Sequence, residues 1–174
     1  MSYCTECGTE LILKENTDEE GSLVPYCPKC EKFRWPGFNT AVNMVVLNPA
    51  KDRVLLIRQY GRPWYILVAG YVNKGEDAED AVAREIREEI GAEVTEIHFN
   101  HSHYFPPSNT LMLNFAAVLA SEEIHINKEV DDYSWFTIEE AKQNIAHGSL
   151  AEAFLNGWFG APFIWPDLNY PPRR

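Results

Sequence analysis

Three glutamates lie close together on a predicted helix within the segment Gly75–Gly91. Three apolar residues of this segment recur every four positions, as on one face of an α-helix: Val82, Ile86 and Ile90. At the same helical spacing Glu85, Glu88 and Glu89 form a ridge beside that apolar stripe. Like charges three or four positions apart repel each other, and the helix dipole disfavours anions in the last turn. The ridge is therefore unfavourable unless something binds it.

A hard divalent cation would remove this repulsion, because Mg²⁺ and Mn²⁺ prefer carboxylate oxygens as ligands. The alternative is an ordinary solvated acidic face, which many helices carry. Taken alone, the ridge leaves both readings open. The ridge belongs to a longer pattern of glycines, charged residues and apolar residues: Gly70, Glu76, Arg84, Glu85, Ile86, Glu88, Glu89, Gly91 and the small apolar Ala92.

This spacing resembles the Nudix box of Nudix hydrolases, and the one soft departure is Ala92, where a larger aliphatic residue is usual. The resemblance implies a loop-helix-loop site that hydrolyses a nucleoside diphosphate linked to another group. It implies that the ridge glutamates bind Mg²⁺ or Mn²⁺, together with the Gly70 carbonyl. Arg84 would orient the glutamates through charge-assisted hydrogen bonds, and Glu76 would brace the loop against the helix.

A further carboxylate is expected outside the box. The segment Lys128–Phe136 resembles the part of Nudix enzymes in which a glutamate precedes a strand containing Trp-Phe. This register implies that Glu129 is an additional metal ligand or the general base, with Asp131 and Asp132 as competitors for that role. The alternative is a solvated acidic loop.

All four cysteines lie before residue 31, as Cys4-x-x-Cys7 and Cys27-x-x-Cys30. This spacing predicts one structural Zn²⁺ per chain, because four thiolates leave no open coordination position. Two disulfides or a redox CxxC motif are the alternatives, and a cytosolic chain disfavours structural disulfides. We expect a zinc ribbon over residues 1–36. A small basic cluster near its end is interpreted as solvated surface, with contact to a substrate phosphate as the alternative: Lys29, Lys32 and Arg34.

The order of predicted elements after the ribbon indicates an α+β fold with a mixed sheet. Strands are predicted over 41–47, 53–59, 64–68, 93–99, 111–119 and 133–136. Capping-box patterns predict two helices. The first begins at Thr137 and is expected to end at Gly148, and the second begins at Ser149. The Nudix fold is an α/β/α sandwich, which agrees with this order. We expect the Nudix domain over residues 37–159. The tail, residues 160–174, is rich in proline and aromatics; we expect it to pack on the domain or on a second subunit, which leaves a homodimer open.

Composition limits the partners of the chain. It has 174 residues, 45% of them hydrophobic, and a net charge of −11. That charge disfavours broad binding to nucleic acid or to an anionic membrane. No apolar run reaches transmembrane length, and the first residues show neither the basic nor the apolar region of a signal peptide. We therefore expect a cytoplasmic protein that acts on a small-molecule nucleotide.

A zinc ribbon followed by a Nudix domain resembles the NADH pyrophosphatase branch of the family. That branch carries a Ser-Gln-Pro-Trp-Pro-Phe-Pro-x-Ser motif after the box, and the stretch Ser102–Ser108 keeps its serine ends, an aromatic and two prolines. The resemblance implies that Ser102, Tyr104, Phe105 and Ser108 contact substrate, with the two rings stacking on a base. Three histidines precede or enter this stretch and are read as strand or surface residues, or as phosphate contacts: His98, His101 and His103.

The predicted reaction is metal-dependent hydrolysis of a dinucleotide such as NADH to AMP and a second mononucleotide. Because the motif is two residues shorter than that of the NADH pyrophosphatases and lacks Gln-Pro-Trp, hydrolysis of ADP-ribose or a related ADP-sugar is the alternative. A different class of function is a nucleotide-sensing module whose zinc ribbon recruits a partner. The intact set of glutamates argues against that reading.

Overall fold

The computed structural model describes residues 2–16 and 21–165. The chain divides into two compact units, residues 1–38 and 39–174. Within the described residues, no helix is both long enough and apolar enough to cross a membrane.

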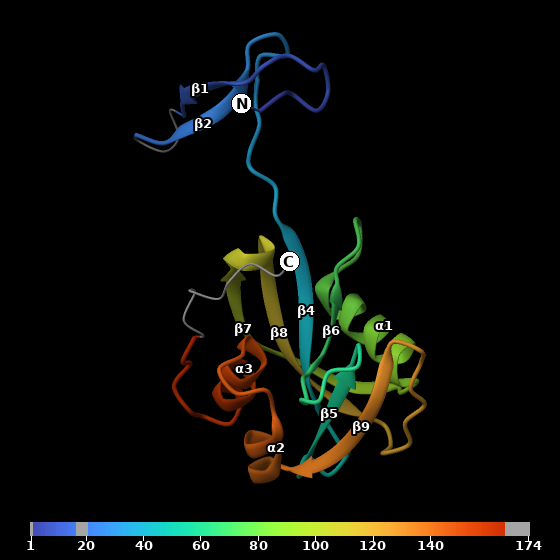
Figure 1. Cartoon of the computed structure of the whole chain (residues 1–174). Helices are drawn as coiled ribbons and strands as arrows, with labels where there is room; N and C mark the ends of the chain where they lie inside the picture. Colours follow the sequence, from blue (N-terminus) through green and yellow to red (C-terminus); the bar gives the residue numbers. More distant parts are fainter. Residues whose placement is uncertain (1, 17–20, 166–174) are drawn as a thin grey trace. The chain divides into compact units, whose positions relative to one another are not determined.

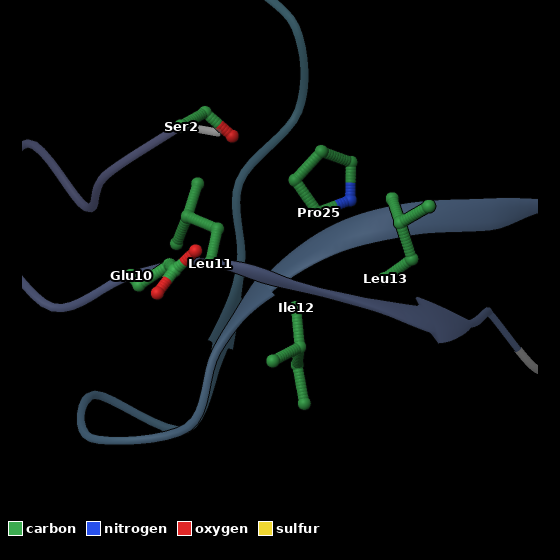
Figure 2. Close-up of a pocket in the computed structure, with 6 residues that line it drawn as sticks. All are labelled: Ser2, Glu10, Leu11, Ile12, Leu13 and Pro25. Atoms are coloured by element: carbon green, nitrogen blue, oxygen red, sulfur yellow. The ribbon is translucent and has the colours of Figure 1, made fainter.

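The first unit contains a small antiparallel sheet in the order β1-β2-β3. Its strands are β1 (Ile12–Glu15), β2 (Leu23–Cys27) and β3 (Lys32–Phe33). Tyr26 of β2 packs edge-on against Phe33 of β3, with ring centroids 5.2 Å apart. A hollow beside β1 is lined by six residues, which Figure 2 draws as sticks: Ser2, Glu10, Leu11, Ile12, Leu13 and Pro25. This hollow offers a single carboxylate and therefore lacks the groups that phosphate chemistry needs.

The second unit is built on a six-stranded mixed sheet (Figure 1). Its strands are β4 (Asn39–Leu47), β5 (Arg53–Gln59), β6 (Val68–Tyr71), β7 (Val94–Phe105), β8 (Thr110–Leu119) and β9 (Val130–Thr137). The main path runs β7-β8-β4-β5-β9, and β6 pairs with β4. The β4–β8 pair is parallel and the other pairs are antiparallel. The parallel pair makes the sheet mixed, as predicted.

Helices cover both faces of this sheet (Figure 1). Helix α1 (Ala78–Ile90) packs on one face, and α2 (Ile138–Asn144) and α3 (Leu150–Trp158) pack on the other. Successive strand residues point to opposite faces, so Met44 of β4 lies in the core beneath α1 while Val45 lies in the core beneath α3. The predicted α/β/α sandwich is confirmed.

Several predicted boundaries needed correction. The strand leading to the box is Val68–Tyr71 rather than 64–68, because residues 65 and 66 make only isolated bridges. Strand β7 extends to Phe105, with a bulge near Asn100, although its polar residues suggested an end at Phe99. Thr137 forms a complete capping box with Glu140, but the helix ends at Asn144 and not at Gly148.

The described part of the tail packs on the second unit. Phe163 stacks on His101 with ring centroids 4.3 Å apart, and Trp165 stacks on His103 at 4.0 Å. Trp165 also meets Phe154 of α3 edge-on at 5.6 Å. Packing on the domain is therefore confirmed up to Trp165, and residues 166–174 of the predicted tail lie outside the described residues.

Candidate active site

Helix α1 presents the glutamate ridge. Its apolar stripe is confirmed, because Val82, Ile86 and Ile90 are fully buried against the sheet. The helix ends at Gly91, whose φ of 62° is left-handed, and a Cβ there would lie 2.8 Å from His125 Cβ. Glycine is therefore required at this position. The close approach of Gly91 to His125 therefore holds the last turn of the helix, which carries Glu88 and Glu89, in place.

Arg84 lies at the centre of a network that joins the loop before α1 to the ridge. Its Nε and one terminal nitrogen donate to both oxygens of Glu76, at 2.7 and 3.0 Å. The other terminal nitrogen donates to Glu85 at 2.7 Å and to Glu88 at 3.0 Å. A further bond reaches the Tyr71 carbonyl at 2.9 Å. These bonds use all five donors of the guanidinium, so two of the three ridge glutamates are held in fixed positions.

Glu76 completes this brace. Besides Arg84, its carboxylate accepts the Asn73 backbone N–H at 2.9 Å. The hydrogen bonds from Arg84 are the main reason that the pKa of Glu76 falls to about 2. Glu76 therefore stays ionised, and it pins the Asn73–Glu76 turn to the helix.

Gly70 lies directly against Glu85. A Cβ at residue 70 would overlap the carboxylate carbon and Oε1 of Glu85. Gly70 does not need glycine for its backbone angles, since its φ is not positive. The glycine instead provides the space that lets the β6 backbone contact a ridge carboxylate, which brings the Gly70 peptide into the site.

Glu89 is the buried member of the ridge, with 5% of its surface exposed. Its Oε2 has no hydrogen-bond partner among the described residues. Burial is the main cause that raises its pKa to about 7, and the charges of Glu85, Glu129 and Glu88 raise it further. The amide of Gln59 on β5 counteracts part of this rise, yet its buried Nε2 also lacks a well-formed hydrogen bond. A buried carboxylate oxygen without a partner is costly.

The segment before β9, which contains Glu129, is hydrogen-bonded to the last turn of α1. The backbone N–H groups of His125 and Asn127 donate to the carbonyls of Ile90 and Glu89, at 2.9 and 3.0 Å. The Asn127 side chain then accepts the Glu129 N–H at 2.8 Å. These bonds tie the segment to the last turn of α1, which explains why the charge of Glu129 acts on Glu89.

Asp131 and Asp132 are engaged elsewhere. Asp131 accepts the Gly61 N–H at 2.6 Å and so anchors the loop after β5. Asp132 forms an ion pair with Arg58, and this partner is the main cause that lowers its pKa. Of the three acids in this segment, Glu129 is thus the one whose charge acts on Glu89.

The donor set of the ridge fits a hard divalent cation. It offers several carboxylates, the Gly70 peptide and a buried oxygen of Glu89 that lacks a partner. The ridge oxygens are more widely spread than the thiols of the ribbon. Among the described residues, the four cysteines are the only group of three or more His, Cys, Asp or Glu side chains whose ligand atoms all lie within 4.8 Å of one another.

The four cysteines fit a closed zinc site. Sγ of Cys4 lies 3.9 Å from Sγ of Cys30, and Sγ of Cys7 lies 3.5 Å from Sγ of Cys27. Zn–S bonds of about 2.3 Å in a tetrahedron place sulfurs about 3.8 Å apart. All four thiols are free of disulfides. The geometry thus favours a tetrathiolate site over the disulfide alternative.

Comparison with known proteins agrees with this geometry. The NUDIX domain pattern matches residues 37–155. The chain belongs to the NUDIX domain family. Its fold is similar to that of a NUDIX hydrolase from Nitrosomonas europaea, with a TM-score of 0.65 and 23% identity, covering 93% of this chain and 95% of that one.

Curated relatives of this NUDIX chain include the NAD-capped RNA hydrolase NudC of Pseudomonas aeruginosa PAO1, which is 32% identical over 157 residues. The match covers 88% of this chain and 54% of the relative. The human NAD-capped RNA hydrolase NUDT12 is 30% identical, with 88% of this chain and 34% of the relative covered. The chain therefore spans about half or less of the length of these relatives.

The four residues predicted to contact substrate lie on β7 and the 3₁₀ helix that follows it, η1 (Pro106–Ser108). Tyr104 is 46% exposed, and its hydroxyl donates to Asn109 at 2.7 Å. Tyr104 and Phe105 are consecutive strand residues, so their rings point to opposite faces of the sheet. Ser102 is exposed on β7, and the Ser108 hydroxyl donates to Thr110 at 3.0 Å. One base therefore cannot stack on both rings.

Two residues near the NUDIX ridge were not predicted from the sequence. Gln59, at the end of β5, acts on Glu89 of α1, 30 positions further along the chain. Tyr71 follows Gly70 directly, is 58% exposed, and gives its carbonyl to Arg84. The position of Tyr71 directly after Gly70 is the sequence feature that could have indicated it. No feature of the sequence around Gln59 indicates that it lies near Glu89.

Proposed function

We propose that this chain hydrolyses the pyrophosphate bond of a nucleoside diphosphate linked to another group, using Mg²⁺ or Mn²⁺. The leading substrate is a dinucleotide such as NADH, which would give AMP and a second mononucleotide. The observation that carries the proposal is the buried Glu89 carboxylate: one of its oxygens has no hydrogen-bond partner among the described residues, and the charges of Glu85, Glu129 and Glu88 act on it. A divalent cation satisfies that oxygen and offsets the repulsion among the four acids.

Hydrolysis of a phosphoanhydride needs a water nucleophile, neutralised phosphate charge and in-line geometry. A bound Mg²⁺ or Mn²⁺, held by the ridge glutamates, Glu129 and the Gly70 carbonyl, would supply the neutralising positive charge. Arg84 holds Glu85 and Glu88 so that their oxygens need little rearrangement. Glu129 is the acid we assign as additional ligand or as acceptor of the proton from the attacking water, because Asp131 and Asp132 have other partners.

Support for a dinucleotide comes from the relatives, which are named NAD-capped RNA hydrolases and whose named substrate thus carries an NAD group. Three aromatics are candidates for stacking on a base: Tyr71 and Tyr104, which are exposed, and Phe105, which is half-buried. We propose Ser102 and Ser108 as polar contacts at the same end of β7. ADP-ribose, which has one base, stays the alternative because the motif after the box is short.

NAD-capped RNA is a second candidate, favoured by the names of the relatives. The net charge of −11 opposes it, because a long polyanion would be repelled by an acidic protein. A nucleotide sensor with a partner-binding ribbon is the remaining alternative. In that case the carboxylates would bind nucleotide without turnover.

A substrate panel tests the proposal. NADH, NAD⁺, ADP-ribose and an NAD-capped oligonucleotide are each incubated with Mg²⁺, with Mn²⁺ and with a chelator, and the products are identified by mass spectrometry. We expect metal-dependent release of AMP from the dinucleotides. A preference for ADP-ribose of about tenfold in kcat/KM, about 1.4 kcal/mol, would replace the dinucleotide assignment. Binding of all four without turnover would favour the sensor.

The remaining assignments extend the same proposal. We propose a division into a zinc ribbon (residues 1–36), a Nudix domain (37–159) and a tail (160–174), close to the two compact units of the structure. One structural Zn²⁺ would be bound by the four cysteines. Cytoplasmic residence and a homodimer stay predictions from the sequence.

A further inference from the structure

Arg34 contacts the cysteine cluster of the ribbon directly. Its Nε donates to Cys4 Sγ at 3.2 Å. The side chain is only 17% exposed, although the residue belongs to a basic cluster that the sequence suggested to be solvated. Its backbone N–H donates to the Pro25 carbonyl at 2.6 Å, which holds the residue beside β2. Arg34 is thus built into the ribbon as part of its interior.

The other thiols have different partners. Cys7 Sγ lies 3.3 Å from the Thr9 hydroxyl, and Cys27 Sγ accepts the Cys30 backbone N–H at 3.4 Å. Within residues 2–16 and 21–165, Arg34 is the one charged side chain in hydrogen-bond contact with a cysteine sulfur. It contacts Cys4, one of the two buried thiols of the cluster.

Charge balance explains why a cation belongs there. Four thiolates and one Zn²⁺ leave two net negative charges in a partly buried site, and such charge is costly unless it is paired. The Arg34 guanidinium supplies one positive charge at Cys4. Its Nη2 forms an ion pair with Glu6 at 2.9 Å, although this buried nitrogen makes no well-aligned hydrogen bond within the described residues. Lys32 lies 4.0 Å from the same Glu6, but its side chain is 65% exposed. Although Lys32 is the cross-strand neighbour of Cys27, its side chain makes no hydrogen bond to a cysteine sulfur within the part of the chain that the structure describes.

We propose that Arg34 is a positioning residue of the zinc site, which retains the metal by donating a charge-assisted hydrogen bond to Cys4. The inference rests on the proposed zinc site. Residues that hydrogen-bond to metal ligands typically change metal affinity by about 10- to 100-fold. Removing the guanidinium should therefore loosen zinc while the four ligands remain in place.

The test measures zinc release from the full chain. Zinc-loaded wild type, Arg34→Gln, Arg34→Lys and Lys32→Gln are mixed with excess chromogenic chelator, and the transfer rate is recorded. We expect Arg34→Gln to release zinc about tenfold faster or more. Arg34→Lys should fall between it and wild type, because lysine keeps the charge but not the fixed donor geometry. The matched control Lys32→Gln removes one charge near the same Glu6 and should release zinc like wild type.

A Co²⁺-substituted form separates this role from a loss of fold. Arg34→Gln should keep the visible bands of tetrahedral cobalt tetrathiolate and shift the sulfur-to-cobalt charge-transfer band, since one sulfur loses its donor. If Arg34→Gln binds no metal, Arg34→Lys is compared with Lys32→Gln: faster release from Arg34→Lys supports the inference, and equal release overturns it. Wild-type release from Arg34→Gln also overturns it. A wild-type chain that holds no zinc would instead refute the zinc site itself.

Discussion

Glu89 differs from the other ridge glutamates in how it is held. Arg84 binds Glu85 and Glu88, whereas Glu89 is buried and has one oxygen that finds no hydrogen-bond partner in the described part of the chain. Such a group destabilises the metal-free protein and gains most when a cation binds. Replacing the Glu89 carboxylate should therefore lower activity but raise the stability of the metal-free protein.

Glu89→Gln should reduce kcat by about 10³-fold through loss of a metal ligand. The substituted side chain has nearly the same shape, so the fold should be kept. Steady-state kinetics with NADH and Mn²⁺ measure the loss. Glu79→Gln, an exposed change in the first turn of the same helix, is the matched control and should keep normal turnover. Near-normal activity of Glu89→Gln would contradict the assignment of the ridge.

The raised pKa of Glu89 also predicts a pH effect on stability. The unfolded carboxyl ionises near 4.5, while the folded one ionises near 7. Between these pH values the folded protein binds more protons than the unfolded chain. The free energy of unfolding of the metal-free protein, as far as it depends on Glu89, therefore falls as the pH rises from about 4.5 to about 7. The carboxylate of Glu76, with its pKa lowered to about 2, acts in the other direction and at pH below 4.5.

Urea unfolding in the presence of chelator measures this effect at pH 5, 6 and 7.5. Wild type is compared with Glu89→Gln, so that other titrating groups cancel. The stability advantage of Glu89→Gln should grow with pH and should disappear when Mg²⁺ or Mn²⁺ is added. An advantage that is constant with pH would show that the carboxylate ionises normally in the folded protein.

At the scale of single residues, spacing along one helix and its loop predicted a group that the structure brings together, in which Arg84 donates to Glu76, Glu85 and Glu88. The catalytic roles of these residues stay predictions. Local spacing could not predict contacts between residues that are far apart in the sequence and are brought together by the fold. Arg34 was read as solvated surface, yet the ribbon folds it onto Cys4, 30 positions earlier. Gln59 acts on Glu89 because α1 packs on the face of the sheet that contains β5.

Among the elements, β7 was the hardest to predict. The predicted strand ended at Phe99, but β7 pairs with β8 as far as Phe105. The rings of Phe163 and Trp165 cover His101 and His103 on one face of this outer part. A strand whose histidines are covered by residues from so distant a part of the chain cannot be recognised from its own periodicity. Helix α1, in contrast, carries its apolar stripe and its C-cap in its own sequence.

The stacking of Trp165 should make the tail part of the folded domain. Trp165→Ala removes contacts with His103, Phe163 and Phe154 and should lower the free energy of unfolding by about 1–3 kcal/mol. Ile164→Ala is the neighbouring control, since Ile164 is 79% exposed, and it should change stability by about 0.5 kcal/mol or less. Denaturant unfolding of both variants measures the difference. Equal effects would mean that the rings do not hold the tail in solution.

At the scale of the whole chain, the two compact units should respond separately to zinc. The protein should bind about one zinc per chain, measured by elemental analysis. Cys27→Ser should lose it and unfold residues 1–38, while the larger unit stays folded on its own core. Hydrogen exchange resolved by peptide distinguishes the two units. Mass analysis that finds disulfides in place of metal would contradict the zinc site, and full protection of residues 1–38 without zinc would contradict its structural role.

Net charge decides between the two leading substrates. With a charge of −11, the protein should repel a capped RNA far more than NADH, because the RNA carries one charge per phosphate along its length. Salt screens such repulsion, and the Debye length is about 10 Å at 0.1 M ionic strength. At fixed Mg²⁺, kcat/KM for a capped oligonucleotide relative to NADH should therefore rise several-fold as ionic strength increases from about 0.02 to about 0.2 M.

NADH serves as the internal reference in this experiment, because its own rate should change less with salt. A capped mononucleotide extended by one residue only should behave like NADH, which separates the charge of the RNA from the chemistry of the cap. If the ratio instead falls with added salt, a locally basic surface must attract the RNA despite the overall charge. NAD-capped RNA would then become the better assignment for this site.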